Sequence, residues 1–320
     1  MKRTTIEANG LKFSALVAGG SGPLVIMCHG FPELAWSWRR QIPAVAAAGF
    51  RVVAPDMRGY GDTGGPDERE AYSIFHLTGD VVALTEAMGE KEAILVGHDW
   101  GASVVWHAAL FRPDMFRGVC AMSVPFQVRR PGKRPTEVYR AVSASKGLGD
   151  FYWVAFTDEG RAERELEADV RRSMLAIFGG IAGKDVKADR WQLFADEQGR
   201  LLQLHSPRPL PAWISEEEFA PFVSAFEKKG FRRPIHWYRN IDDNWERCAP
   251  WLGAGVRIPA LFITGEKDPV RGFAGSGEEN LEKYVPDLRG KVVIPGAGHW
   301  VQQERPQEVN DHLLAFLKSL

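Results

Sequence analysis

Residues 92–110 decide the fold, and they read EAILVGHDWGASVVWHAAL. The apolar run 93–96 is long enough for a buried strand, and the run 102–110 has the composition of a helix. Between them stands Gly-x-Asp-x-Gly, which is the nucleophile-elbow pattern Gly-x-Ser-x-Gly with Asp99 in place of the serine. Such a turn is too tight for flanking side chains, so it would project Asp99 above the positive end of the following helix. Taken alone, the five residues are more often a glycine turn with a helix cap, so the context has to decide.

The composition is that of an ordinary globular protein. The chain has 320 residues, of which 45% are hydrophobic and 25% charged, enough for one large domain or a core with an insertion. The net charge of −1 favours neither nucleic acid nor an anionic membrane as a partner. The basic N-terminus lacks an apolar segment, and no run reaches about 18 apolar residues. We therefore expect no signal peptide and no membrane span.

The cysteines and the glycine patterns argue against metals and cofactors. Cys28, Cys120 and Cys248 are odd in number and widely spaced, which fits a reducing cytoplasm, and the apolar runs around Cys28 and Cys120 predict that these two are small core residues. The sequence has neither a zinc-ligand spacing nor a glycine-rich nucleotide motif. We expect no metal and no cofactor, and the sequence leaves open whether the chain forms a homodimer.

Strand and helix patterns alternate through most of the chain. Asn9-Gly10 is a strong hairpin signal between the first two apolar runs. Strands are predicted at 3–8, 11–17, 24–28, 51–55, 93–96, 118–124, 258–264 and 291–295, and helices at 38–48, 73–88, 102–110 and 306–320. This alternation predicts an α/β protein with a mostly parallel eight-stranded sheet covered by helices on both faces.

The pattern changes after residue 126. A basic, proline-rich linker at 129–135 is followed by about a hundred residues with helical patterns and no convincing strand. Helices are predicted at 159–178 and 219–229, and Ser215 with Glu218 forms a capping box before the second. We therefore predict a core at 1–126 and 241–320 with a helical lid at 127–240.

Two further polar residues follow the late strands. Asp268 comes shortly after the strand at 258–264, and His299 follows the strand at 291–295. Reactive groups in open parallel sheets gather beyond the carboxyl ends of the strands, so Asp99, Asp268 and His299 should meet at one edge. Their order in the chain, nucleophile then acid then histidine, is the order for this type of elbow. The three together predict a catalytic triad.

An aspartate nucleophile suits a particular reaction. A carboxylate is already charged at neutral pH, so Asp99 can displace a group at a saturated carbon and form an alkyl ester. Water activated by His299 can then hydrolyse that ester, while Asp268 orients the imidazole.

The tetrahedral intermediate of that hydrolysis needs N–H donors around its oxyanion. The residue after the nucleophile, Trp100, would supply one, and Phe31 in the loop His29-Gly-Phe-Pro32 would supply the other. Phe31 can also line a pocket with its ring. His29 belongs to the same loop, where a structural hydrogen bond is more typical than catalysis.

Four motifs together resemble one family. They are His-Gly-Phe-Pro at 29–32, Arg-Gly-Tyr-Gly at 58–61, Gly-His-Asp-Trp-Gly at 97–101 and Gly-His-Trp at 298–300. Over nearly its whole length the sequence resembles the epoxide hydrolases of the α/β-hydrolase fold. The resemblance implies a cis Phe31–Pro32 bond and conversion of a small apolar epoxide, with water, to a vicinal diol. Some relatives carry the triad acid near Ser123, where this chain has none, so Asp268 is the candidate.

The resemblance also implies two lid tyrosines that hydrogen-bond the epoxide oxygen. Tyr238, in His-Trp-Tyr-Arg-Asn at 236–240, matches one of them. Tyr152 is the better match for the other, with Tyr139 as the alternative. A phenol is protonated at pH 7 and can act as a neutral general acid for the departing alkoxide. Aromatic residues near the lid, namely Phe126, Phe151, Trp153 and Trp237, predict an apolar pocket.

Three rival interpretations remain. A haloalkane or haloacid dehalogenase also uses an aspartate nucleophile, and Trp100 could help bind its halide, but Tyr238 would have no role. An esterase is disfavoured because the elbow lacks serine. A ligand-binding protein on a hydrolase fold is disfavoured because Asp99, Asp268 and His299 are all present.

Overall fold

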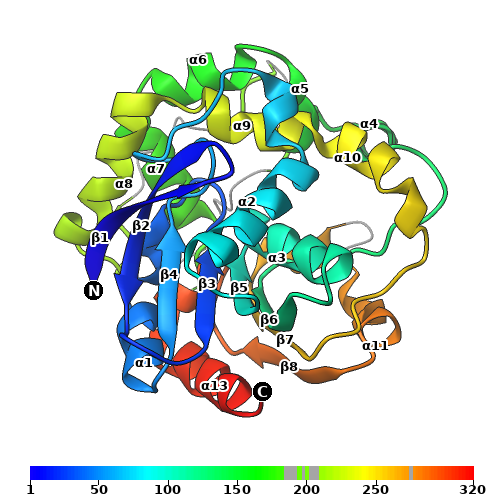
Figure 1. The fold of residues 1–320 in the computed structure, drawn as a ribbon. Helices are drawn as coiled ribbons and strands as arrows, with labels where there is room; N and C mark the ends of the chain where they lie inside the picture. Colours follow the sequence, from blue (N-terminus) through cyan, green and yellow to red (C-terminus); the bar gives the residue numbers. More distant parts are fainter. Residues whose placement is uncertain (184–192, 197–198, 202–208, 274–276) are drawn as a thin grey trace.

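The computed structural model describes residues 1–183, 193–196, 199–201, 209–273 and 277–320. Its centre is an eight-stranded sheet in the order β1-β2-β4-β3-β5-β6-β7-β8 (Figure 1). The strands are β1 (Lys2–Ala8), β2 (Leu11–Ala18), β3 (Leu24–Cys28), β4 (Arg51–Pro55), β5 (Ala93–His98), β6 (Phe116–Met122), β7 (Ala260–Gly265) and β8 (Leu288–Ile294). The pairs β1–β2 and β2–β4 are antiparallel. All the other neighbouring strands, from β4–β3 to β7–β8, pair in parallel. The predicted mostly parallel eight-stranded sheet is confirmed.

Both faces of the sheet are buried, which explains the continuous apolar runs of its central strands. Every residue of β3 and β5 is buried. Side chains of successive strand residues alternate between two apolar clusters. One cluster contains residues of α2 (Ile74–Ala87) and α3 (Trp100–Phe111), and the other contains residues of α1 (Gln41–Ala47) and α13 (Pro306–Lys318). Two helices on each face therefore hold the strand ends in place.

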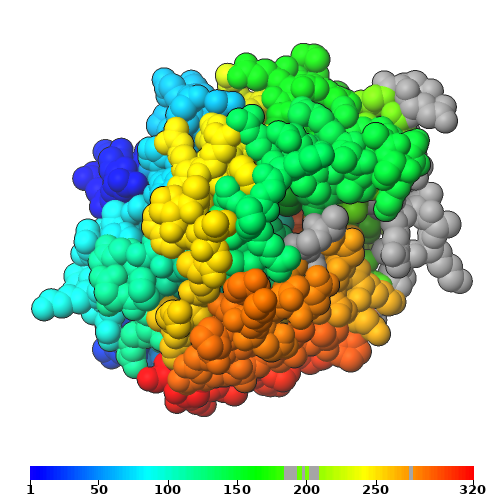
Figure 2. Space-filling model, turned by 90° about the vertical axis from the view of Figure 1, so that its right-hand side faces the viewer, coloured from blue at the N-terminus to red at the C-terminus, as the bar shows by residue number. Residues whose placement is uncertain are grey.

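A layer of helices separates β6 from β7 in the chain. These helices are α4 (Pro135–Lys146), α5 (Tyr152–Thr157), α6 (Arg161–Glu167), α7 (Val170–Gly180), α8 (Glu216–Lys229), α9 (Arg232–Arg239) and α10 (Ile241–Arg247). They arch across the top of Figure 1, and Figure 2 shows the green and yellow helices lying against the orange segment of the core. Side chains tie the two parts together, since the Trp237 indole donates to the Arg58 carbonyl. This is the predicted helical insertion. The predicted limits 127–240 stay a prediction, and residues 184–192, 197–198 and 202–208 within them lie outside the described part.

Several predicted boundaries are wrong, each for a local reason. The helix predicted at 159–178 is two helices, α6 and α7, because Asp169 leaves the helical conformation and accepts the Arg172 N–H as a cap. The helix predicted at 38–48 begins only at residue 41. Pro43 then lies in the first turn, where a residue without an N–H group is tolerated because these N–H groups have no partner within the helix. Before it, a short 3-10 helix covers Ala35–Trp38. The strand predicted at 118–124 ends at residue 122, because Ser123 has φ +70°. The capping box at the start of α8 is as predicted.

Candidate active site

The elbow between β5 and α3 holds Asp99 in a strained conformation, with φ 54° and ψ −121°. The glycines two positions before and after Asp99 have no room for a side chain. A Cβ on Gly97 would lie 2.3 Å from the Gly101 carbonyl oxygen, and one on Gly101 would lie 2.0 Å from the Cys28 carbonyl oxygen. Strain of this kind persists only where the surrounding structure imposes it. The chain thus places the Asp99 carboxylate at the carboxyl edge of the sheet and before the first turn of α3.

The three residues predicted as a triad lie together. His299 is buried between two carboxylates, with Nδ1 3.1 Å from Asp268 Oδ1 and Nε2 3.6 Å from Asp99 Oδ2. The same Asp268 oxygen accepts the Val270 N–H at 3.0 Å. With its Nδ1 proton directed at Asp268, the imidazole presents Nε2 to Asp99.

The two carboxylates control the charge of His299. Burial alone would lower the pKa of His299, but Asp268 and then Asp99 outweigh it and raise the pKa to about 10. Burial alone would raise the pKa of Asp268, but the neighbouring imidazolium holds it below its usual value. At neutral pH the resting site therefore contains an imidazolium between two carboxylates.

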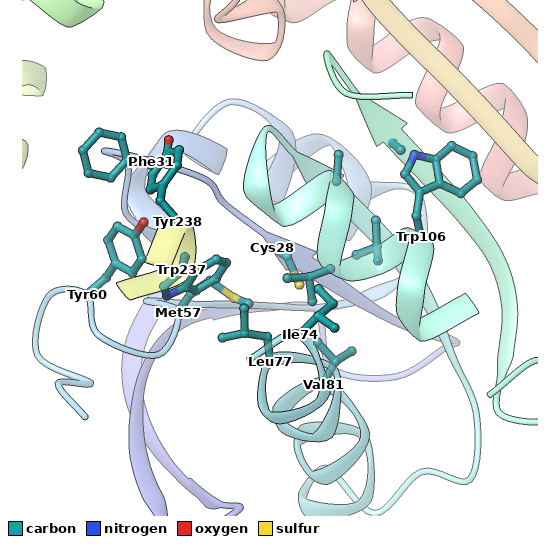
Figure 3. Close-up of a cluster of buried hydrophobic side chains, with 14 of the residues drawn as sticks. Cys28, Phe31, Met57, Tyr60, Ile74, Leu77, Val81, Trp106, Trp237 and Tyr238 are labelled. Carbon is teal, nitrogen blue, oxygen red and sulfur yellow. The ribbon is translucent and has the colours of Figure 1, made fainter. Parts of the chain in front are cut away.

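The loop after β3 directs one backbone donor at the Asp99 carboxylate. The Phe31 N–H donates to Asp99 Oδ1 at 2.8 Å. The Phe31–Pro32 bond is cis, as the resemblance implied. Figure 3 shows Phe31 beside Tyr238, and their ring centroids are 5.4 Å apart. Trp100 follows Asp99 in the chain as the first residue of α3, and its ring centroid lies 5.1 Å from that of Tyr238.

The His29 side chain contacts two backbone groups near this loop. Its Nε2 accepts the Met57 N–H at 2.9 Å, and its Nδ1 lies 2.9 Å from the Gly30 carbonyl oxygen. Burial lowers the pKa of His29, so the ring is neutral with its proton on Nδ1. Both nitrogens are occupied by backbone groups, which favours a structural role over contact with a substrate.

The lid brings two tyrosines close to Asp99. Tyr152 on α5 and Tyr238 on α9 have ring centroids 5.8 Å apart. Burial and the charge of Asp99 raise the pKa of Tyr152 well above its usual value, and burial with Tyr152 and Asp99 does the same for Tyr238. Both phenols are therefore protonated at neutral pH. Tyr139 instead stacks on Phe151 at 4.1 Å, so the pairing with Tyr238 favours Tyr152 as the first lid tyrosine.

A cavity of about 400 Å³ opens beside Asp99 and is bordered by Trp100 and Tyr152. Much of its wall is apolar, and the apolar part includes Val124, Phe126, Val128, Trp153, Val270 and Phe273. Of the four aromatic residues expected around the pocket, Phe126 and Trp153 line this cavity. The other two, Phe151 and Trp237, are buried elsewhere. The Phe151 ring stacks on Tyr139, and the Trp237 indole contacts the loop around Arg58. The cavity suits a mainly apolar substrate.

Sequence reasoning missed the role of Ser123. This residue is fully buried, follows β6 directly and has φ +70°, a conformation that costs energy for a residue other than glycine. Its Oγ lies 3.0 Å from His299 Nδ1. The strained backbone thus places a hydroxyl against the same nitrogen that faces Asp268. A serine before Val-Pro carries no sequence signal for such a contact.

A buried polar network beneath the site was also missed. Glu33 Oε2 accepts the Gly30 N–H at 3.1 Å and faces His98 Nδ1 at 2.7 Å, while Oε1 accepts the amides of Gln302 and Gln303. The other nitrogen of His98 faces the His299 carbonyl oxygen at 2.7 Å. Both ring nitrogens of His98 therefore face acceptor oxygens. Although burial alone would raise the pKa of Glu33, His98 lowers it to about 2. This network connects the Phe31 loop to the backbone of His299.

Among the described residues, no group of three or more His, Cys, Asp or Glu side chains could hold a metal ion. Within the same residues, no helix combines the length and the apolar character needed to cross a membrane.

Comparison with known proteins identifies the family. The family model described as alpha/beta hydrolase fold matches residues 23–306. Epoxide hydrolase A of Mycobacterium tuberculosis is 43% identical over 317 residues, which cover 98% of this chain and 97% of that protein. The chain belongs to the epoxide hydrolases of the α/β-hydrolase fold. This membership confirms the predicted fold and the predicted enzyme class, a hydrolase acting on ether bonds.

Solved structures of other epoxide hydrolases agree along the whole chain. Epoxide Hydrolase A from Mycobacterium thermoresistibile has a TM-score of 0.91 at 42% identity and covers 99% of this chain and 98% of its own. An epoxide hydrolase from an endophytic Streptomyces has a TM-score of 0.94 at 36% identity, and the match covers 99% of this chain and 95% of that one. The plant enzyme Epoxide hydrolase 2 of Siraitia grosvenorii is 38% identical, covering 99% of this chain and 98% of that protein.

Proposed function

We propose that this protein converts epoxides to vicinal diols through a covalent ester on Asp99. The proposal rests on the groups that surround the Asp99 carboxylate. Oδ1 of Asp99 accepts the Phe31 N–H at 2.8 Å, and Oδ2 lies 3.6 Å from His299 Nε2. Two protonated phenols lie on the lid above this group. A nucleophile, a general acid and a base are therefore all within one site.

In the first step, Asp99 Oδ2 attacks an epoxide carbon. The new C–O bond forms as the ring C–O bond breaks, and the ring oxygen takes a proton from a phenol of Tyr152 or Tyr238. A general acid is needed because an alkoxide is a poor leaving group, and such proton transfers typically contribute 10²- to 10⁴-fold in rate. Oδ1, held by the Phe31 N–H, becomes the carbonyl oxygen of the ester.

Before the second step, the phenolate regains a proton from the His299 imidazolium, which leaves the imidazole neutral. His299 then removes a proton from water, and the water oxygen attacks Cγ of the Asp99 ester. Negative charge then develops on Oδ1, where the Phe31 N–H already donates and the Trp100 N–H is the second proposed donor. Collapse of this intermediate releases the diol, whose alkoxide regains a proton from the imidazolium. The new Asp99 carboxyl group then gives its proton to the imidazole, which restores the carboxylate and the imidazolium. Asp268 orients the ring and stabilises its charged form.

The alternative function is dehalogenation of a haloalkane or haloacid by the same nucleophile. Loss of halide requires no proton, so the two lid phenols would have no task in it. Their pairing over Asp99 and the family membership both favour epoxides. The mainly apolar wall of the cavity supports an alkyl or aryl epoxide as the substrate.

A substrate panel tests the proposal. Purified protein is given aryl, alkyl and fatty-acid epoxides and, separately, haloalkanes, with diol and halide release followed in parallel. We expect diol from at least one epoxide class, and Asp99→Asn as the control should remove it. Halide release by a wild-type protein that is inert toward every epoxide would instead support the dehalogenase.

A further inference from the structure

One face of α3 forms part of the cavity wall. Most of this helix is buried, and its partly exposed residues include Trp100, Ser103 and His107. Residues three or four positions apart share one helix face, and all three border the cavity beside Asp99. The helix that begins at the nucleophile therefore carries polar side chains along the cavity, away from the reacting carboxylate.

The imidazole of His107 offers an unused acceptor on this wall. Its Nδ1 lies 2.7 Å from the Ser103 carbonyl oxygen, so Nδ1 carries a proton. Burial lowers the pKa of His107, so the ring is neutral and Nε2 holds a lone pair. Within the described part of the chain, Nε2 has no hydrogen-bond partner. A polar atom left in this way on a cavity wall is available to a ligand donor.

An amide on α10 offers the complementary donor. Asn244 also borders the cavity, and its Oδ1 accepts the Ile74 N–H at 2.9 Å, which leaves the amide N–H groups for other partners. Phe75 stacks on Phe111 at 5.3 Å, and Phe111 packs edge-on against His107 at 5.6 Å. Both side chains border the same cavity, and this series of contacts links the part of the wall that carries Asn244 to His107.

The part of the wall that carries His107 is remote from the chemistry. His107 is eight residues beyond Asp99, which is about 12 Å along a helix that rises 1.5 Å per residue. We propose that His107 and Asn244 form a subsite for a hydroxyl group at the far end of the substrate chain. The substrate O–H would donate to His107 Nε2, and its oxygen would accept from the Asn244 amide. This inference rests on the proposed function and adds the substrate class: epoxides that carry a distant alcohol.

Matched substrates test the subsite. Terminal alkyl epoxides that end in a hydroxyl are compared with methyl-ended counterparts over a series of chain lengths, and the ratio of the two kcat/KM values is recorded. We expect the ratio to reach about tenfold, the value of one net hydrogen bond, at one chain length only. His107→Phe should bring that ratio close to one, and His107→Gln, which keeps an acceptor, should restore part of it. His312→Phe, an exposed position on α13, is the control and should leave the ratio unchanged.

Binding separates failure of the subsite from failure of the function. The product diols, with and without the extra hydroxyl, are titrated by calorimetry, which needs no turnover. Tighter binding of the hydroxylated diol to wild type, lost in His107→Phe, supports the subsite even if no epoxide is hydrolysed, and in that case the proposed function fails alone. Equal binding of the two diols, or a preference that His107→Phe leaves intact, overturns the subsite.

Discussion

The two half-reactions should respond differently to pH, because the charge beside His299 changes during the cycle. In the free enzyme, His299 Nε2 is 3.6 Å from the charged Asp99 carboxylate, and the pKa of His299 is raised to about 10. Formation of the ester removes that negative charge while Asp268 remains. The imidazolium therefore loses one of its two stabilising neighbours as soon as the ring opens.

The size of this change follows from the distance. Two unit charges 3.6 Å apart interact by roughly 4.5 kcal/mol at an effective dielectric constant of about 20. This energy corresponds to about three powers of ten in the protonation equilibrium, so the pKa of His299 should fall from about 10 to roughly 7 in the ester. The direction is downward, and the neutral base that activates water therefore becomes available near neutral pH only after ring opening.

Single-turnover kinetics between pH 5 and pH 10 can measure both steps. Intrinsic tryptophan fluorescence in a stopped-flow instrument would follow ester formation and decay, with Trp100 next to the reacting group as a reporter. Ester hydrolysis should rise about tenfold per pH unit below a midpoint near 7 and then level off, whereas ring opening should show no such rise. Hydrolysis that still accelerates above pH 9, or that is flat from pH 5 to pH 9, would refute this electrostatic reasoning.

Three further changes have defined outcomes. Tyr238→Phe and Tyr152→Phe should each slow ring opening by about a hundredfold in single-turnover assays, and near-normal diol formation by the double variant would rule the phenols out as acids. Ser123→Ala and Ser123→Gly should lose similar activity, about tenfold for the loss of a hydroxyl that contacts both His299 Nδ1 and Asp268, although only glycine suits φ +70°. Full activity of the glycine variant would exclude a role for the hydroxyl. Glu33→Gln should lower the free energy of unfolding by roughly 1–3 kcal/mol in urea, because the new amide N–H groups would face donors that the buried carboxylate now accepts, and an unchanged midpoint would contradict the role of this network.

The fold could be predicted because its signals are local. Continuous apolar runs followed by glycine turns indicate buried parallel strands, and Ser215 with Glu218 marks a helix start by side-chain chemistry alone. The errors arose where a single residue overrides the periodicity. Asp169 fits a helical pattern by spacing but caps α7 instead, and a pattern of hydrophobicity does not distinguish these two uses.

The site could be predicted only in part, for a related reason. Asp99, Asp268 and His299 each follow a strand, so strand order brings them to one edge. Ser123 contacts His299 through a backbone conformation that no sequence pattern indicates. The contact between His98 and Glu33 joins residues 65 positions apart, and it depends on how the loop after β3 packs beneath β5. Such contacts are products of the tertiary structure.

The covalent ester on Asp99 is the central claim, and trapping it is the most direct test. His299→Gln removes the base that activates water but leaves Asp99, the Phe31 N–H and the lid phenols in place. Mass spectrometry of this variant after addition of an epoxide substrate should show one substrate mass added to the protein, on the peptide that contains Asp99. The double variant with Asp99→Asn should carry no adduct. A folded His299→Gln protein that binds the epoxide yet remains unmodified would contradict the two-step mechanism.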